Sequence, residues 1–141
     1  HSAALPPSPE YLGSPEYQEP HRRGEILVSA TMNAFLSVWA RRLEALVSGA
    51  GEATVDRARA AEEGAATADY LLTMAIRALD YCPPVHLKFG TFLSAMLTAD
   101  REIRPADERY RFREHLLEAF GWYGISHAAL DRAGGAVVRA A

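Results

Sequence analysis

The chain has 141 residues, of which 49% are hydrophobic and 23% are charged, and its formal net charge at pH 7 is -3. These values are typical of one folded domain of ordinary size. The negative charge removes the usual electrostatic basis for binding nucleic acid or anionic membrane. No apolar run approaches the roughly 18 residues that a membrane-spanning helix needs, and no signal peptide is recognisable. We therefore expect a soluble protein that binds neither nucleic acid nor membrane, in a compartment that the sequence does not reveal.

The first 20 residues are rich in proline and show no periodic pattern. Tyr11, Leu12 and Tyr17 are the only apolar anchors in this segment. Such a composition favours a lead-in that is extended, follows the surface of the domain or is disordered. Because a free-standing domain seldom begins in this way, we interpret the chain as a segment of a longer protein.

A first long helix is predicted from Arg22 to about Val47. Apolar residues occur on nearly every side of it, and the polar interruptions in its apolar part are small: Ser29, Thr31, Asn33 and Ser37. A helix of this kind should be covered on most sides. The helices that follow are too few to cover it completely. We therefore expect an apolar surface that is exposed, buried in a homodimer, or covered by a missing partner domain.

A second long helix is predicted from Thr54 to Tyr81, with Thr54 as its N-cap and Asp56 in its first turn. Its first half is rich in alanine and charge. Gly64 should weaken it by about 1 kcal/mol relative to alanine, and it is a candidate kink position.

The second half of this helix and the corner that ends it form the expected centre of the fold. Residues 70–79 are apolar on nearly every side, which is typical of a buried core helix. Pro83 and Pro84 then end the helix, because proline lacks an amide hydrogen and clashes with the preceding turn. Cys82 lies at this corner and is interpreted as a small buried hydrophobic residue. It is the only cysteine, which excludes an internal disulfide and a cysteine-rich zinc site.

Two amphipathic helices follow the corner. The third runs from about Phe89 to Arg101, and its apolar stripe at helical spacing consists of Phe89, Phe92, Leu93, Met96 and Leu97. The fourth is predicted to begin at Asp107 and to end near Phe120. Its apolar side consists of Phe112, Leu116, Ala119, Phe120 and Tyr123, opposite Glu108, Arg111, Glu114 and Glu118.

The predicted fold class is all-α: a compact bundle of four to five helices with an extended, proline-rich N-terminal lead-in. The lead-in covers residues 1–20 and the helical domain residues 21–125. Residues 126–141 are expected to form a short helix, from Ser126 to Arg132, and a tail.

The residues that could carry chemistry do not assemble into an active site. No metallopeptidase, phosphate-binding or nucleophile motif is present. His115 and Glu118 have helical spacing but no third ligand, so they are interpreted as part of a solvated helix face. His86 is expected in a loop, and Asp107 and Glu108 are expected to cap a helix. We predict neither a metal site nor a cofactor site within this chain.

His21 is the one candidate site residue. It follows Pro20 and precedes the basic start of the most apolar helix. A helix N-terminus carries partial positive charge and free N–H groups, which suits the stabilisation of an oxyanion. The alternative is that His21 is an ordinary surface or capping residue, and the spacing alone favours that alternative.

Three segments resemble the C-terminal helical part of bacterial gluzincin metallopeptidases, the relatives of thermolysin. They are EPHRRGEILVSATMNAFL, LTMAIRALDYCPPVHLKFGTFLSAMLTAD and RYRFREHLLEAFGWYGI. In that family a histidine leads into a long helix, a later helix ends in a tyrosine-rich corner, and a closing helix ends in Ala-Phe-x-x-x-Gly-Ile. The last pattern stands here as Ala119-Phe120 and Gly124-Ile125. The resemblance covers about Pro20 to Ile125 and rests on the order and spacing of the three segments.

The resemblance implies a role for His21 and a missing zinc site. His21 matches the family histidine that stabilises the tetrahedral oxyanion, and Glu16 and Glu19 are the nearby candidates for the carboxylate that orients it. The family's zinc ligands and catalytic glutamate lie upstream, and this chain contains none of them. The expected partners are thus the N-terminal catalytic half of the same protein, which would hold the zinc, and a peptide substrate.

Two functions remain open. The chain is either one wall of the substrate cleft of a zinc metallopeptidase, inactive alone, or a non-catalytic helical protein-interaction module. An upstream H-E-x-x-H motif followed by a glutamate would favour the peptidase.

Overall fold

A computed structural model describes residues 4–51, 55–82, 88–127, 129–130 and 136–137 of the chain. The fold class is all-α, as predicted. The described residues contain two short 3-10 helices, η1 (Pro9–Gly13) and η2 (Pro15–Gln18), and four α-helices: α1 (Pro20–Ala50), α2 (Arg57–Leu79), α3 (Phe89–Ile103) and α4 (Phe112–Trp122). Two-residue strands, β1 (Ala129–Leu130) and β2 (Ala136–Val137), pair antiparallel near the C-terminus.

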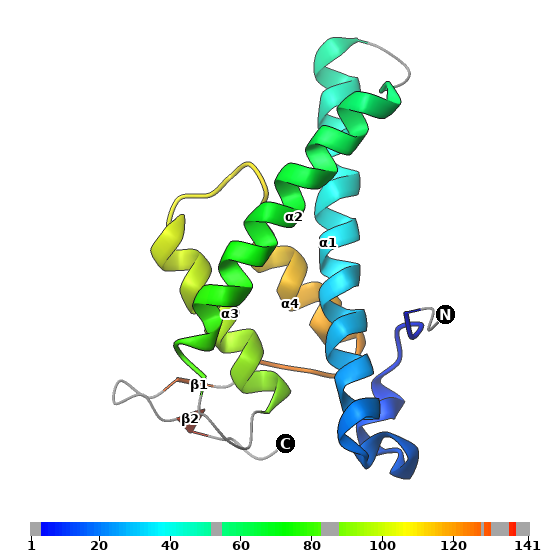
Figure 1. The fold of residues 1–141 in the computed structure, drawn as a ribbon, viewed down its shortest axis with the longest axis vertical. Coiled ribbons are helices and arrows are strands. Elements are labelled where there is room, and N and C mark those ends of the chain that lie inside the picture. The colour runs from blue at the N-terminus through cyan, green and yellow to red at the C-terminus, as the bar shows by residue number, and fades with distance from the viewer. Residues whose placement is uncertain (1–3, 52–54, 83–87, 128, 131–135, 138–141) are drawn as a thin grey trace.

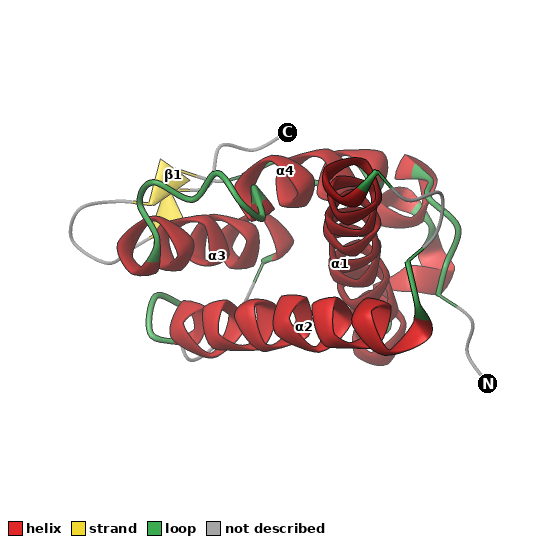
Figure 2. Cartoon of the chain, turned by 90° about the horizontal axis from the view of Figure 1, so that it is seen from above, coloured by secondary structure: helices red, strands yellow, loops and turns green. Residues whose placement is uncertain are grey.

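The α-helices form a bundle, and α1 is the longest of them. Figure 1 shows α1 and α2 joined at one end of the molecule, with α2 crossing in front of α1 and α3 and α4 behind. Figure 2, which looks nearly along α1, places α2 on one side of the bundle and α3 and α4 on the other. α1 contacts both α4 and α2, and α2 also packs on α3. The core therefore lies between two layers of helices.

The proline-rich lead-in is fixed on the bundle. The backbone amide of Leu5 donates to Ser29 Oγ at 2.9 Å, and its carbonyl accepts from the Tyr123 hydroxyl at 2.5 Å. Asn33 of α1 donates to the same hydroxyl at 2.8 Å. The rings of Tyr11 and Tyr123 stack with their centroids 6.3 Å apart. The expected lead-in that follows the surface of the domain is therefore confirmed, and the alternative of a disordered segment is wrong for the described residues. From Pro9 to Gln18 the lead-in is not extended throughout, because 3-10 turns lead from there into α1.

α1 and α2 cross closely at Gly64. A Cβ atom added there would lie 2.9 Å from Trp39 Cε2, so only glycine fits against the indole ring. The indole nitrogen of Trp39 donates to the carbonyl of Ala60 at 3.0 Å, one turn earlier on α2. Gly64 thus serves close packing within a continuous helix rather than a kink.

α2 differs from its prediction in its bounds and in its burial. Its N-cap is Asp56, whose carboxylate accepts from the amide of Arg59 at 2.8 Å, whereas Thr54 lies outside the described residues. The helix buries one stripe only, consisting of Glu63, Gly64, Thr67, Tyr70, Met74 and Ala78. Leu72 and Ile76 are 59% and 58% exposed. The prediction of a core helix is wrong, because α1 and α3 cover a single face of α2.

The buried sides of α3 and α4 agree with the sequence. Leu93, Met96 and Leu97 are buried, and Phe89 and Phe92 pack against the core. All five residues predicted on the apolar side of α4 are buried. The start of α4 was predicted wrongly: Asp107 precedes the helix by five residues and accepts from the amides of Arg109, Tyr110 and Arg111, each at 3.0 Å.

The C-terminal segment also departs from its prediction. Within the expected helix from Ser126 to Arg132, residues 129–130 form β1 instead. Positions 128 and 131–132, together with Pro83, Pro84 and His86 of the corner, lie outside the described residues. None of the helices in the described ranges is long and apolar enough to cross a membrane.

Candidate functional site

His21 lies in the first turn of α1, which begins at Pro20. Proline suits this position because its fixed φ matches the helix and its missing amide hydrogen would have no partner there. Glu19 is the N-cap residue, and its carboxylate accepts from the amide of Arg22 at 3.1 Å. The local sequence Glu-Pro-His therefore begins the helix and sets the histidine beside a carboxylate.

Glu19 also binds the His21 ring. Glu19 Oε1 lies 2.8 Å from His21 Nδ1, and the histidine side chain is 95% exposed. This hydrogen bond raises the pKa of His21 and lowers the pKa of Glu19. Of the two carboxylates considered for this role, Glu19 makes the contact, whereas Glu16 pairs with Arg22 at 3.7 Å. The imidazolium form of His21 is therefore favoured at higher pH than in a free histidine.

A small apolar pocket of about 280 Å³ adjoins His21. Leu5 and Ala4 of the lead-in form one wall, and Gly24 and Val28 of α1 form part of the other. The anchored lead-in thus forms one wall of the space beside the histidine, and no pattern in the sequence predicts this pocket.

The remaining candidates of the sequence lie elsewhere. His115 and Glu118 are on α4, far along the chain from His21, and Glu118 is exposed. His115 is only partly exposed, and burial lowers its pKa. Within the described residues, no group of three or more histidine, cysteine, aspartate or glutamate side chains could hold a metal ion. The zinc site expected in an upstream domain stays a prediction.

The structure contains a buried polar network that the sequence did not predict. Asp100 of α3 is 1% exposed, accepts a short hydrogen bond from the Tyr70 hydroxyl and pairs with Arg113 Nη1 at 2.9 Å. The Arg104 guanidinium stacks 3.8 Å from the centre of the Tyr70 ring. Burial raises the pKa of Asp100, and its bonds to Tyr70 and Arg113 oppose that rise. The network joins α2, α3 and α4, and its closed pairing indicates a structural role.

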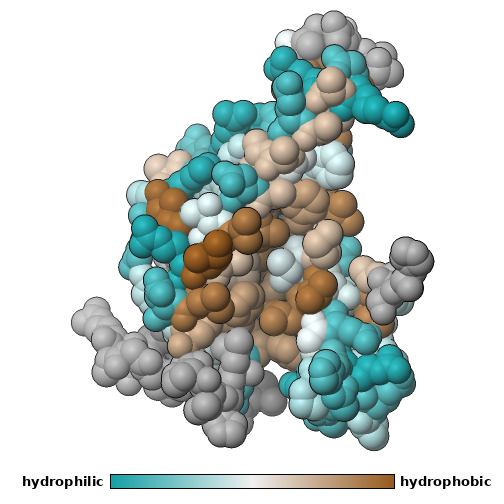
Figure 3. Space-filling model, viewed as in Figure 1, coloured by the Kyte–Doolittle hydropathy of each residue, from teal (hydrophilic) through white to brown (hydrophobic). Residues whose placement is uncertain are grey.

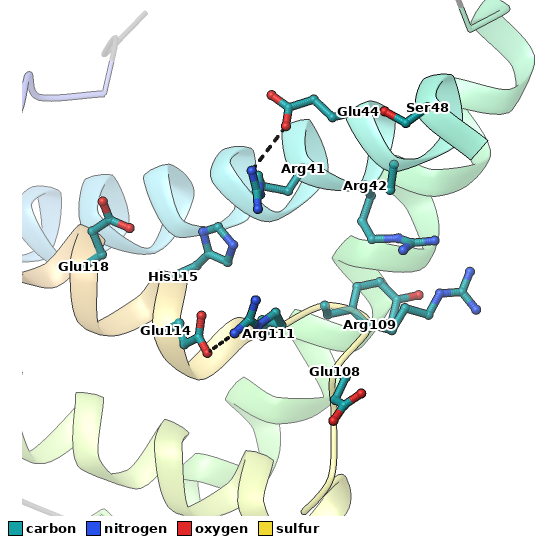
Figure 4. Close-up of a pocket in the computed structure, with 12 residues that line it drawn as sticks. Arg41, Arg42, Glu44, Ser48, Glu108, Arg109, Arg111, Glu114, His115 and Glu118 are labelled. Carbon is teal, nitrogen blue, oxygen red and sulfur yellow. Dashed lines mark hydrogen bonds and ion pairs between the residues drawn. The ribbon is translucent and has the colours of Figure 1, made fainter. Parts of the chain in front are cut away.

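A second pocket lies between the C-terminal half of α1 and the start of α4 and has a volume of about 710 Å³. We call it the charged pocket. Arg41 and Arg42 of α1 line it, together with Arg109, Arg111 and His115 (Figure 4). Arg111 has a left-handed backbone with φ 54°, which is uncommon outside glycine. No local sequence pattern predicts that these arginines lie around one pocket, because they come from segments about 70 positions apart.

An apolar surface covers one face of the bundle. Figure 3 shows hydrophobic side chains gathered over α2 and α1 in this view. The large apolar side chains of these two helices that are exposed are Val28, Met32, Leu36, Leu72, Ile76 and Leu79. We call these six residues the α1–α2 face. They are spaced three or four residues apart on each helix, so each set lies on one side of its helix. Val28 also lines the pocket beside His21.

Comparison of the chain with protein-family models, with curated proteins and with solved structures gave no match.

Proposed function

We propose that this chain forms one wall of the substrate cleft of a zinc metallopeptidase, with His21 as the donor that stabilises the oxyanion formed during peptide hydrolysis. The contact between His21 and Glu19 carries the proposal. A donor to an oxyanion must be accessible to a ligand, fixed in orientation and protonated. His21 is exposed, its Nδ1 is bound to Glu19, and this bond raises its pKa.

The chemistry at His21 follows from its protonated form. Nδ1–H donates to Glu19, which leaves Nε2–H free to donate to a ligand. As negative charge grows on the oxygen of the attacked carbonyl, this charge-assisted bond strengthens more in the transition state than in the ground state. The adjoining N-terminus of α1 adds partial positive charge on the same side.

Zinc would supply the activated water for such a reaction, and the described residues do not fit a zinc site. The zinc ligands would then lie in another part of the protein. In this view the α1–α2 face packs against that catalytic half.

A helical interaction module is the second candidate, and the α1–α2 face is the observation that favours it. Large exposed apolar patches on soluble proteins mark surfaces that bind other chains. The two candidates differ at His21: an interaction module has no requirement for its protonation or for its bond with Glu19.

Steady-state kinetics of the complete protein with a peptide substrate tests the peptidase proposal. His21→Ala should lower kcat by about 10²–10³-fold with little change in KM, as is usual for loss of one oxyanion donor. His127→Ala is the matched control, because His127 is an exposed histidine beyond α4, and it should leave kcat unchanged. Full activity of His21→Ala would refute the assignment.

The pH dependence of kcat in the Glu19→Gln variant is a second test of the same proposal. Without the carboxylate, the pKa of His21 falls back towards its ordinary value near 6.5. Because the protonated form is the donor, the alkaline limb of the kcat profile should move to lower pH. Glu16→Gln, at an exposed carboxylate outside the contact, should leave the profile in place. An identical shift in both variants would show that Glu19 has no specific role.

A further inference from the structure

We propose that the charged pocket binds an anionic group, a phosphate or carboxylate of a small ligand, between Arg41 of α1 and Arg111 at the start of α4. Its volume of about 710 Å³ falls in the range of small-molecule sites. The pocket is separate from the His21 site and does not depend on the function proposed there.

Two of the arginines that line the pocket are paired with exposed glutamates, which a ligand could displace. Arg41 pairs with Glu44 at 3.4 Å, and Arg111 pairs with Glu114 at 2.8 Å. All four side chains are more than half exposed, and exposed ion pairs of this kind contribute little to stability. An incoming anion can therefore replace the glutamates at small cost. The planar guanidinium groups suit it, because each can donate two parallel hydrogen bonds to an oxyanion.

One buried nitrogen at the pocket, His115 Nδ1, has no hydrogen-bond partner among the described residues. Figure 4 shows the His115 ring projecting between Arg41 and Arg111. Buried polar nitrogens without a partner are rare in folded proteins. His115 Nδ1 is a donor in one tautomer, so an oxygen of an anion bound between the two arginines would supply the acceptor that it lacks. Arg42 belongs to a different ion pair: its Nη2 donates to Glu63 Oε1 at 3.0 Å, and the unpartnered Arg42 Nε and Glu63 Oε2 are both atoms of that pair.

The backbone at Arg111 adds a constraint of the kind found at binding sites. Its left-handed conformation is disfavoured for arginine, and the Asp107 carboxylate holds it by accepting the Arg111 amide at 3.0 Å. This turn sets the Arg111 side chain on the pocket opposite α1. Four glutamates line the pocket beside its four arginines, so removal of a competing glutamate should tighten the binding of an anion.

Titration of the isotopically labelled chain with inorganic phosphate, and separately with succinate, tests the proposal by NMR at constant ionic strength. We expect saturable shifts at Arg111 and His115, and the anion that binds more tightly identifies the ligand class. Arg41→Gln and Arg111→Gln should each weaken binding by about tenfold or more, whereas Glu114→Gln should tighten it several-fold. Arg77→Gln removes an exposed arginine of α2 that does not line the pocket, and it should change nothing.

Arg41→Gln lies within a regular helix, so it stays informative even if Arg111→Gln disturbs the turn. Unsaturable shifts for both anions, or equal weakening by Arg77→Gln and Arg41→Gln, would identify an adventitious ion only and overturn the proposal. Weaker binding in Glu114→Gln would also overturn it.

Discussion

Two neighbouring regions of α2 reverse the usual placement of polar and apolar side chains. Tyr70 faces inward, where its hydroxyl bonds the fully buried Asp100. Two residues later Leu72 is mostly exposed, as is Ile76 one turn further on. The difference shows that hydropathy alone does not decide burial here. The packing of α1 and α3 against α2 buries one face of α2. Polar residues on that face can be buried because they have hydrogen-bond partners there.

The two regions also differ in how they stabilise the protein. The buried polar network has closed hydrogen bonds, so removal of one member leaves others without partners. The side chains of the α1–α2 face are 41–61% exposed, so polar substitutions there should cost the fold little. The face is available for an interaction instead. The following variants test this contrast, from the largest expected effect to the smallest.

Asp100→Ala should cause a large loss of stability. Arg113 would keep only the carbonyl oxygens of Arg104 and Pro105, and the Tyr70 hydroxyl would keep only a 3.3 Å contact with Asp107. Breaking a buried charge pair on one side costs about 3 kcal/mol or more. Urea unfolding measures the change. Asp69→Ala, at an exposed aspartate of α2, should change the free energy of unfolding by less than about 0.5 kcal/mol. Equal effects of the two variants would show that the network does not stabilise the bundle.

Gly64→Ala should give an intermediate loss, because this glycine sets the crossing that selects the inner face of α2. The new Cβ would lie 2.9 Å from Trp39 Cε2, and overpacking of this kind costs about 1–3 kcal/mol. The gain in helix propensity offsets up to about 1 kcal/mol. Gly49→Ala, where no heavy atom lies within 4 Å of the added Cβ, should stabilise instead. Thermal unfolding of both variants gives the sign, and stabilisation by Gly64→Ala would contradict the close crossing.

The sequence predicted the parts of the fold that carry a one-sided pattern. Leu93 and Met96 of α3 lie on a single apolar stripe, and the stripe is buried. Residues 70–79 of α2 are apolar on nearly every side, so the sequence did not indicate which side of the helix is buried. Gly64 was interpreted as a weak point of the helix, because its role depends on Trp39 of another helix.

The candidate site shows the same limit. Glu19 and His21 are two residues apart, so their contact could be anticipated among the nearby carboxylates. Asp100 and Tyr70 are 30 residues apart, and neither stands out in the sequence around it. Their pairing could therefore not be predicted. The left-handed backbone of Arg111 likewise has no signal in the sequence, because no glycine or asparagine stands there.

The smallest effect on stability is expected from Leu72→Gln combined with Ile76→Gln. Both side chains are more than half exposed, and glutamine is a good helix former. Each change should therefore alter the free energy of unfolding by less than about 0.5 kcal/mol. Met74→Ala is the matched contrast on the buried side of the same helix and should cost about 2–5 kcal/mol.

The same double variant should have its main effect on binding at the α1–α2 face. The chain alone should increase the fluorescence of an apolar dye, and the double variant should do so much less, because polar groups would interrupt the face. Sedimentation velocity over a range of concentrations shows whether a second copy covers it: a concentration-dependent dimer that the double variant abolishes assigns the face to self-association. A monomer that binds the dye leaves the face free for another partner, such as the proposed catalytic half. Equal dye binding by the two proteins, or a loss of stability close to that of Met74→Ala, would show that these leucine and isoleucine side chains belong to the core rather than to an interaction surface.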